Sequence, residues 1–201
     1  MAQTHYDPKF YSIPEAYLAL YKGIKTSLST ITFKKSTDTL SDEFKERIML
    51  AVTEVNSCEI CSYVHTRIAL EKGLDEEEVQ MILGGNSENI PEQERVAILF
   101  AQHYADTRGK PARQAWNTLV ETYGEQKSRY ILGAIRTMMI GNIFGVPVSA
   151  FKNRLKGKPN KKSNIGYELS MMVLPIVFAP IAFVHALISQ ALRIPLLSFR
   201  N

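Results

Sequence analysis

Residues 45–65 read KERIMLAVTEVNSCEICSYVH and contain both cysteines of the 201-residue chain. Cys58 and Cys61 are followed by His65, and at about 100° per residue these positions fall within roughly 60° of one another around a helix. Two thiols at this spacing can close a disulfide, and a neighbouring imidazole can hold or move the proton that must leave a thiol before it becomes a nucleophile. The stretch therefore predicts a helix with thiol chemistry on one face.

The rest of the chain carries helix signals and no convincing alternating strand pattern between hairpin turns. Capping residues, helix-spaced apolar positions and stopping glycines divide residues 1–150 into short helices. The last of these is predicted to end near Phe144, before the Gly145-Val-Pro147 sequence. Short connections between such helices favour antiparallel packing. The sequence predicts an all-α helical bundle, with helix starts near Ser12, Ser41, Cys58 (with Ser57 as its N-cap), Asp75, Pro91, Pro111 and Glu125.

The composition indicates one sizeable hydrophobic core with an appendage, because 45% of the residues are hydrophobic and 22% are charged. The net charge of +4 comes from residues 152–162, which contain six basic side chains and no acidic one. Without these six, the net charge becomes −2, which argues against a nucleic-acid-binding surface on the folded core. The N-terminal sequence has neither a basic segment nor an apolar segment of signal-peptide type, so we expect a cytoplasmic, reducing environment.

The composition also divides the chain into a helical domain at residues 1–150, a basic linker at 151–162 and an apolar extension at 163–201. No Asp, Glu, Lys or Arg occurs from Leu169 to Leu192, although Pro175, Pro180 and His185 interrupt the apolar run. One interpretation is a single tilted or re-entrant membrane segment, with the basic linker at the inner face of the membrane. The other is that the extension packs into a groove of the same or a neighbouring subunit.

The cysteine pair has several interpretations. A closed zinc site needs about four ligands, and only Cys58, Cys61 and His65 lie in this stretch. A thioredoxin-like site would follow a strand in an α/β unit, and no such strand is visible. The cysteines could also be buried core residues without chemistry. Near the first turn of a helix, however, the helix dipole favours a thiolate, while the charge of Glu59 opposes it.

The stretch from Lys45 to His65 resembles the signature of the alkylhydroperoxidase D branch of the carboxymuconolactone decarboxylase superfamily. In that signature a glutamate precedes the first cysteine by twelve residues, and the order Glu, Cys-x-x-Cys, x-x-x-His is kept. The corresponding residues here are Glu46, Cys58, Cys61 and His65. The resemblance continues over residues 40–150. One difference is Ile60, because family members often carry an aromatic residue or a histidine just before the second cysteine.

The resemblance implies roles for these residues. Cys61 would be the peroxidatic cysteine, and Cys58 would resolve its sulfenic acid to an intramolecular disulfide. Glu46 and His65 would form the proton relay, although Glu54 and Glu59 are rivals for the carboxylate. The implied partners are a hydrogen or organic peroxide and a dithiol or thioredoxin-like reductant, with no metal, flavin or haem required. The family also implies a homo-oligomer.

Two other functions stay open. The cysteine pair could act as a redox-responsive regulatory or scaffold element that oxidises once without turnover. Alternatively, His65 and Glu46 could carry decarboxylase or isomerase-type proton transfer, although that branch usually lacks the cysteine pair.

Overall fold

The computed structural model describes residues 7–32, 40–86 and 90–200. All regular structure within these residues is helical, with no strand, so the predicted all-α fold is confirmed. The helices are α1 (Ile13–Thr32), α2 (Asp42–Asn56), α3 (Glu59–Glu71), α4 (Glu76–Leu83), α5 (Glu92–Asp106), α6 (Arg113–Leu155) and α7 (Ile165–Ala191).

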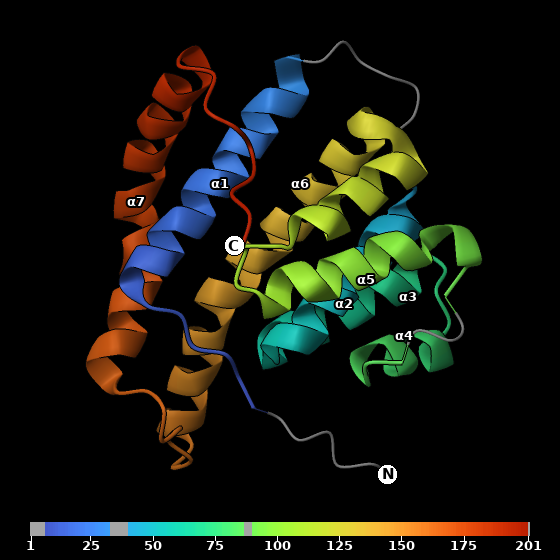
Figure 1. The fold of residues 1–201 in the computed structure, drawn as a ribbon. Coiled ribbons are helices and arrows are strands. Elements are labelled where there is room, and N and C mark those ends of the chain that lie inside the picture. Colours follow the sequence, from blue (N-terminus) through green and yellow to red (C-terminus); the bar gives the residue numbers. More distant parts are fainter. Residues whose placement is uncertain (1–6, 33–39, 87–89, 201) are drawn as a thin grey trace.

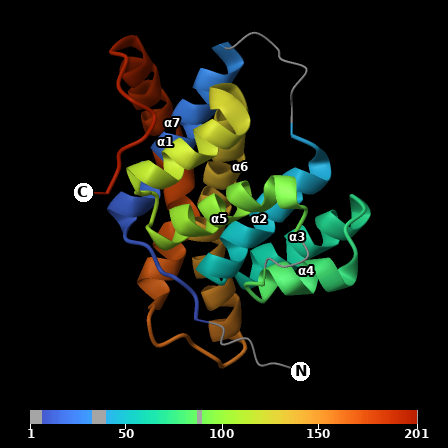
Figure 2. The same ribbon diagram turned by 45° about the vertical axis from the view of Figure 1, so that its right-hand side comes forward.

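The long helix α6 runs through the middle of the molecule and separates two groups of helices (Figures 1 and 2). On one side lies α2, which packs against α3, α4, α5 and α6 and contributes much of the buried core. On the other side, α1 packs against both α6 and α7. The cysteine helix α3 therefore belongs to the first group, and the apolar helix α7 to the second.

Several predicted helix boundaries are seen as capping contacts. Ser41 accepts a hydrogen bond from the backbone N–H of Phe44 at 3.1 Å, and Asp75 accepts one from Glu78 at 2.7 Å. Gly124 interrupts α6 with non-helical angles (φ 74°, ψ 163°), as predicted. A positive φ costs glycine little, because glycine has no Cβ to clash with the backbone.

The start of the cysteine helix is one residue later than predicted. Ser57 is not its N-cap; it ends α2 in the left-handed region (φ 50°) and donates its N–H to the carbonyl of Glu54. Cys58 takes the N-cap position of α3 with an extended backbone. The end of α2 and the start of α3 lie within three residues of each other. Ser57 ends α2 in the left-handed conformation, so it cannot also cap the start of α3.

The prediction that the helix ends near Phe144 is wrong, because α6 continues through Pro147 to Leu155. Proline removes one intrahelical donor, but Val146, Pro147 and Ala150 are buried here, so packing offsets the lost hydrogen bond. Residues 151–155 are therefore helical and not part of a linker. The connection between α6 and α7 is limited to residues 156–164.

The apolar extension forms one continuous helix, α7, despite Pro175 and Pro180. It packs along α1, where Tyr21 Oη donates to Ser189 Oγ at 2.7 Å. Beyond α7 the chain turns back over the bundle (Figure 1).

The buried Arg136 anchors this returning segment. Arg136 is only 2% exposed. Its guanidinium donates hydrogen bonds to the carbonyl of Leu196 at 2.7 Å, to Thr26 Oγ1 at 2.6 Å and to Tyr104 Oη at 2.9 Å. A buried guanidinium needs several acceptors to offset its desolvation. Arg136 therefore joins α1, α5 and α6 to the C-terminal segment.

Candidate redox site

Cys58 and Cys61 are joined by a disulfide, with their Cα atoms 5.2 Å apart. Cys58 is the N-cap of α3, and Cys61 is the third residue of the helix. Cys58 is fully buried, whereas Cys61 is 7% exposed. The two cysteines thus occupy the positions that a capping side chain and its target normally occupy at a helix start.

The sulfur of Cys58 makes no capping hydrogen bond, so another group must satisfy the free N–H groups of the first turn. Ser149 of α6 does this for Ile60, whose N–H donates to Ser149 Oγ at 3.3 Å. This hydrogen bond connects the first turn of α3 to α6, although the two residues are 89 positions apart in the sequence.

Close approach of α6 to the disulfide depends on Gly145. A Cβ atom built on Gly145 would lie 2.7 Å from Cys61 Sγ and 2.8 Å from Cys58 Sγ, closer than real Cβ contacts. The carbonyl oxygen of Gly141, one turn earlier, lies 3.6 Å from Cys61 Sγ. The backbone of α6 therefore forms one wall of the site, and a side chain at position 145 would occupy the space of the sulfurs.

Glu46 of α2 and His65 of α3 form a hydrogen-bonded pair, with Glu46 Oε2 2.8 Å from His65 Nδ1. Both side chains are largely buried, with exposures of 11% and 17%. With the imidazole neutral, Nδ1 carries the hydrogen donated to the carboxylate, which leaves Nε2 as the proton acceptor. The pair is therefore a carboxylate-oriented imidazole one helical turn beyond Cys61.

The two rival carboxylates lie elsewhere. Glu54 lines a surface pocket together with Lys9 and Asp106, and burial raises the pKa of its carboxyl above the usual value, while Lys9 opposes this shift. Glu59 accepts a hydrogen bond from the Asn153 amide of α6 at 3.0 Å. Of the three candidates, Glu46 is the one hydrogen-bonded to His65.

The position of Cys61 favours a thiolate when the disulfide is open. The first turn of α3 presents backbone N–H groups and the positive end of the helix dipole, both of which stabilise a negative sulfur. Glu59 opposes this, but it lies on the exposed surface with its hydrogen bond to Asn153, so solvent screens its charge.

A cavity of about 360 Å³ adjoins the start of α3. Ile60, Tyr63 and Ser149 line it, together with the basic side chains of Lys152 and Lys156. Ile60, one of the two residues between the cysteines, thus borders a solvent-connected space.

The side-chain amide of Asn142 of α6 is buried and only partly hydrogen-bonded within the described residues. Its Oδ1 accepts from Thr53 Oγ1 at 3.3 Å, whereas its Nδ2 has no hydrogen-bond partner among the described residues. Such a donor costs about 1–3 kcal/mol unless water or a ligand satisfies it.

Within residues 7–32, 40–86 and 90–200, no group of three or more His, Cys, Asp or Glu side chains is arranged to hold a metal ion.

The segment that carries Glu46, both cysteines and His65 also has a family match. Residues 21–88 match the model of the Carboxymuconolactone decarboxylase family. The chain is thus similar to this family over residues 21–88, about a third of its length, and the all-α bundle is consistent with that similarity. No curated protein and no solved structure matches the chain.

The carboxymuconolactone decarboxylase match stops before α6, which supplies the residues that sequence reasoning missed. The sequence alone places Gly145 at a helix end and gives no reason to single out Ser149. A glycine inside an apolar helical stretch costs about 1 kcal/mol relative to alanine, so its presence signals a packing requirement. That signal could have identified Gly145 but not the helix it contacts.

Proposed function

We propose that this protein is a thiol-dependent peroxidase of the alkylhydroperoxidase D type, which reduces hydrogen peroxide or organic hydroperoxides. The observation that carries the proposal is the Cys58–Cys61 disulfide at the first turn of α3, together with His65 of the same helix, whose imidazole is hydrogen-bonded to Glu46 of α2. Closing this disulfide from its dithiol form supplies the two electrons that peroxide reduction needs.

In the proposed cycle, His65 takes the proton of the Cys61 thiol and the thiolate attacks the terminal oxygen of the peroxide. The O–O bond breaks, Cys61 becomes a sulfenic acid, and the alkoxide or hydroxide leaves with the proton from His65 as an alcohol or water. The Cys58 thiol then displaces water from the sulfenic acid and closes the disulfide. An external dithiol or thioredoxin-like reductant reopens it, and its own two thiols become a disulfide.

The division of roles between the cysteines follows from exposure and position. Cys61, 7% exposed, is the less deeply buried of the two cysteines and lies within the first turn of α3, where a thiolate is stabilised. Cys58 is fully buried, so a peroxide reaches it less easily. This difference supports Cys58 as the resolving cysteine.

Trapping the intermediate tests the proposal. Cys58→Ser is expected to consume about one equivalent of peroxide per chain and then stop, because Cys61 can become a sulfenic acid but has no thiol to resolve it. Mass spectrometry after dimedone treatment should find the label at Cys61. In the wild type, thiol mapping after peroxide treatment should find the Cys58–Cys61 link and no label. Sustained wild-type turnover by Cys58→Ser would contradict the proposal.

The carboxylate of the relay can be identified by substitution. Glu46→Gln removes the charge that orients His65 and is expected to slow peroxide turnover by roughly 10- to 100-fold, as loss of a partner that orients a histidine typically does. Glu54→Gln and Glu59→Gln are the matched controls, because Glu54 lines a surface pocket with Lys9 and Glu59 accepts a hydrogen bond from Asn153. If either control lost as much activity as Glu46→Gln, the assignment of Glu46 would fail.

The same measurements separate the two alternatives. A redox-responsive regulator would consume one equivalent of peroxide in the wild type and would not continue when a dithiol is added. A decarboxylase-type enzyme would keep its activity in Cys61→Ser, since His65 and Glu46 would carry the reaction. The peroxidase proposal requires continuous turnover with a dithiol and dependence on both sulfurs.

A further inference from the structure

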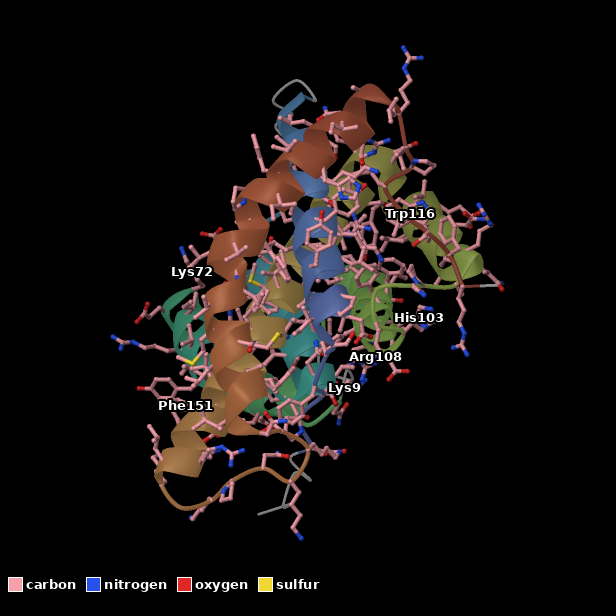
Figure 3. The ribbon with its side chains drawn as sticks, turned by 90° about the vertical axis from the view of Figure 1, so that its left-hand side faces the viewer. Lys9, Lys72, His103, Arg108, Trp116 and Phe151 are labelled. Atoms are coloured by element: carbon pink, nitrogen blue, oxygen red, sulfur yellow. A yellow bond between two sulfur atoms is a disulfide. The ribbon has the colours of Figure 1, made fainter. Side chains whose placement is uncertain are left out.

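Helix α7 presents large apolar side chains to the outside of the molecule. α6 and α7 are both long and apolar enough to cross a membrane. The most apolar stretch of α6 is 61% buried inside the molecule, whereas that of α7 is only 17% buried. Figure 3 views the molecule from the α7 side and shows this helix in front, uncovered by the rest of the described chain. The exposed side chains include Leu169, Met172, Val173, Ile176, Val177, Ile181, Phe183, Val184, Leu187 and Ile188.

The inner face of α7, which packs against the bundle, carries smaller and more polar side chains than the outer face. Ala182, Ala186 and Ser189 are buried against the bundle, and His185 Nδ1 lies 2.9 Å from Tyr17 Oη of α1. At about 100° per residue, the exposed apolar side chains cover roughly half of the helix circumference, opposite these residues. Small and hydrogen-bonding residues between helices, with large apolar ones outside, are typical of helices that face lipid.

The segment before α7 adds charge of one sign. Lys156, Lys158, Lys161 and Lys162 are exposed and lie in the connection between α6 and α7, which contains no acidic residue. Lys162 forms an ion pair with Asp7, so Lys156, Lys158 and Lys161 carry the charge argument. Arg193 is exposed at the other end of the helix. Basic side chains beside an apolar helix face match the negative surface of an anionic bilayer.

The inner neighbour of α7 decides how the helix can meet a bilayer. α1 packs along it and carries Glu15, Lys22 and Lys25. A transmembrane α7 would draw these charged groups into the hydrocarbon region, which is costly. The packing therefore favours a helix lying in the plane of the membrane over the tilted or re-entrant span.

We propose that the outer face of α7 docks the protein on the surface of an anionic lipid bilayer, with the helix parallel to the membrane and the residue 156–162 lysines on lipid headgroups. The site of thiol chemistry lies in the other group of helices, beyond α6 (Figure 2). Docking and peroxide reduction are therefore separable properties, and either proposal can fail without the other.

Vesicle flotation of the purified full-length chain tests this proposal. The wild type should float with vesicles of phosphatidylcholine and phosphatidylglycerol, and more weakly with phosphatidylcholine alone. Ile176→Glu, at a side chain 76% exposed, should weaken binding by about tenfold or more, because it places a charge in the docking face. Leu99→Glu is the matched control, since this leucine is 51% exposed on α5 and should leave flotation unchanged.

A second variant tests the charge contribution. Substitution of Lys156, Lys158 and Lys161 by glutamine should reduce the preference for anionic vesicles by roughly tenfold or more and weaken its salt dependence. Thermal unfolding of each variant should match the wild type, because the changed side chains are exposed.

Two outcomes would overturn the proposal. The first is absence of flotation at low salt, or equal flotation of the wild type and Ile176→Glu. The second is a lipid-free oligomer that Ile176→Glu dissociates in sedimentation, with no vesicle binding by the wild type. That result would make a second copy of this chain the occupant of the α7 face.

Discussion

Cys61→Ser is expected to abolish peroxide turnover and to consume no peroxide even in a single cycle. A serine hydroxyl stays protonated at neutral pH and cannot take the place of the thiolate, while the remaining Cys58 sulfur is fully buried. The measurement is peroxide consumption with a dithiol in excess, together with the number of equivalents consumed when no reductant is present. This is the largest effect that the proposed mechanism predicts.

Cys58→Ser is the matched control for this experiment, because both variants lose the same disulfide. Any change in stability that follows from losing the bridge is common to the two, so a difference in peroxide consumption reports the chemistry of the sulfur that remains. One equivalent consumed by Cys58→Ser and none by Cys61→Ser would support the assigned roles. The reverse pattern, with a sulfenic acid at Cys58, would exchange them.

Gly145→Ala is expected to destabilise the oxidised protein by about 1–3 kcal/mol, because the added methyl group must displace the sulfurs or the backbone of α6. The methyl would lie 2.7 Å and 2.8 Å from the two Sγ atoms and 3.3 Å from Ile60 Cγ2. In the reduced protein the thiols can rotate away, so the loss should be smaller. Denaturant unfolding with and without a reductant measures both values, and turnover should fall because disulfide closure is obstructed.

Gly133→Ala provides the control on the same helix. A Cβ atom added at Gly133 would have Thr26 Cγ2 as its nearest neighbour, at 3.9 Å, which is an ordinary van der Waals contact. Since alanine is favoured over glycine inside a helix by about 1 kcal/mol, this variant should be as stable as the wild type or more stable. Equal behaviour of the two variants would show that close packing against the disulfide is not what position 145 requires.

Local sequence rules predicted the parts of the fold that depend on local contacts. Ser41 and Asp75 cap helices as expected, and Gly124 breaks α6. The rules failed at Pro147, where burial of a whole helix face outweighs one missing donor. They also misplaced Ser57, because capping of one helix competes with termination of the previous helix within two residues.

The candidate site was predictable only within the stretch of residues 45–65. Resemblance selected Glu46, but the periodicity of α2 alone could not exclude Glu54, because the rotation of α2 against α3 is a property of the packed bundle. Gly145 and Ser149 could not be placed beside the cysteines for the same reason. They follow the cysteines by more than eighty residues, and only the packing of α6 against α3 brings them together.

The hydrogen bond from Ile60 N–H to Ser149 Oγ has a consequence for the reaction cycle. Because a hydroxyl from another helix anchors the main chain between the two cysteines, one of the contacts that hold this turn does not involve the sulfur bridge. This contact reduces the reorganisation expected when the bridge closes and opens. The oxidised and reduced proteins would present nearly the same contour to an electron donor, which suits rapid repeated cycling better than signalling by a change of shape.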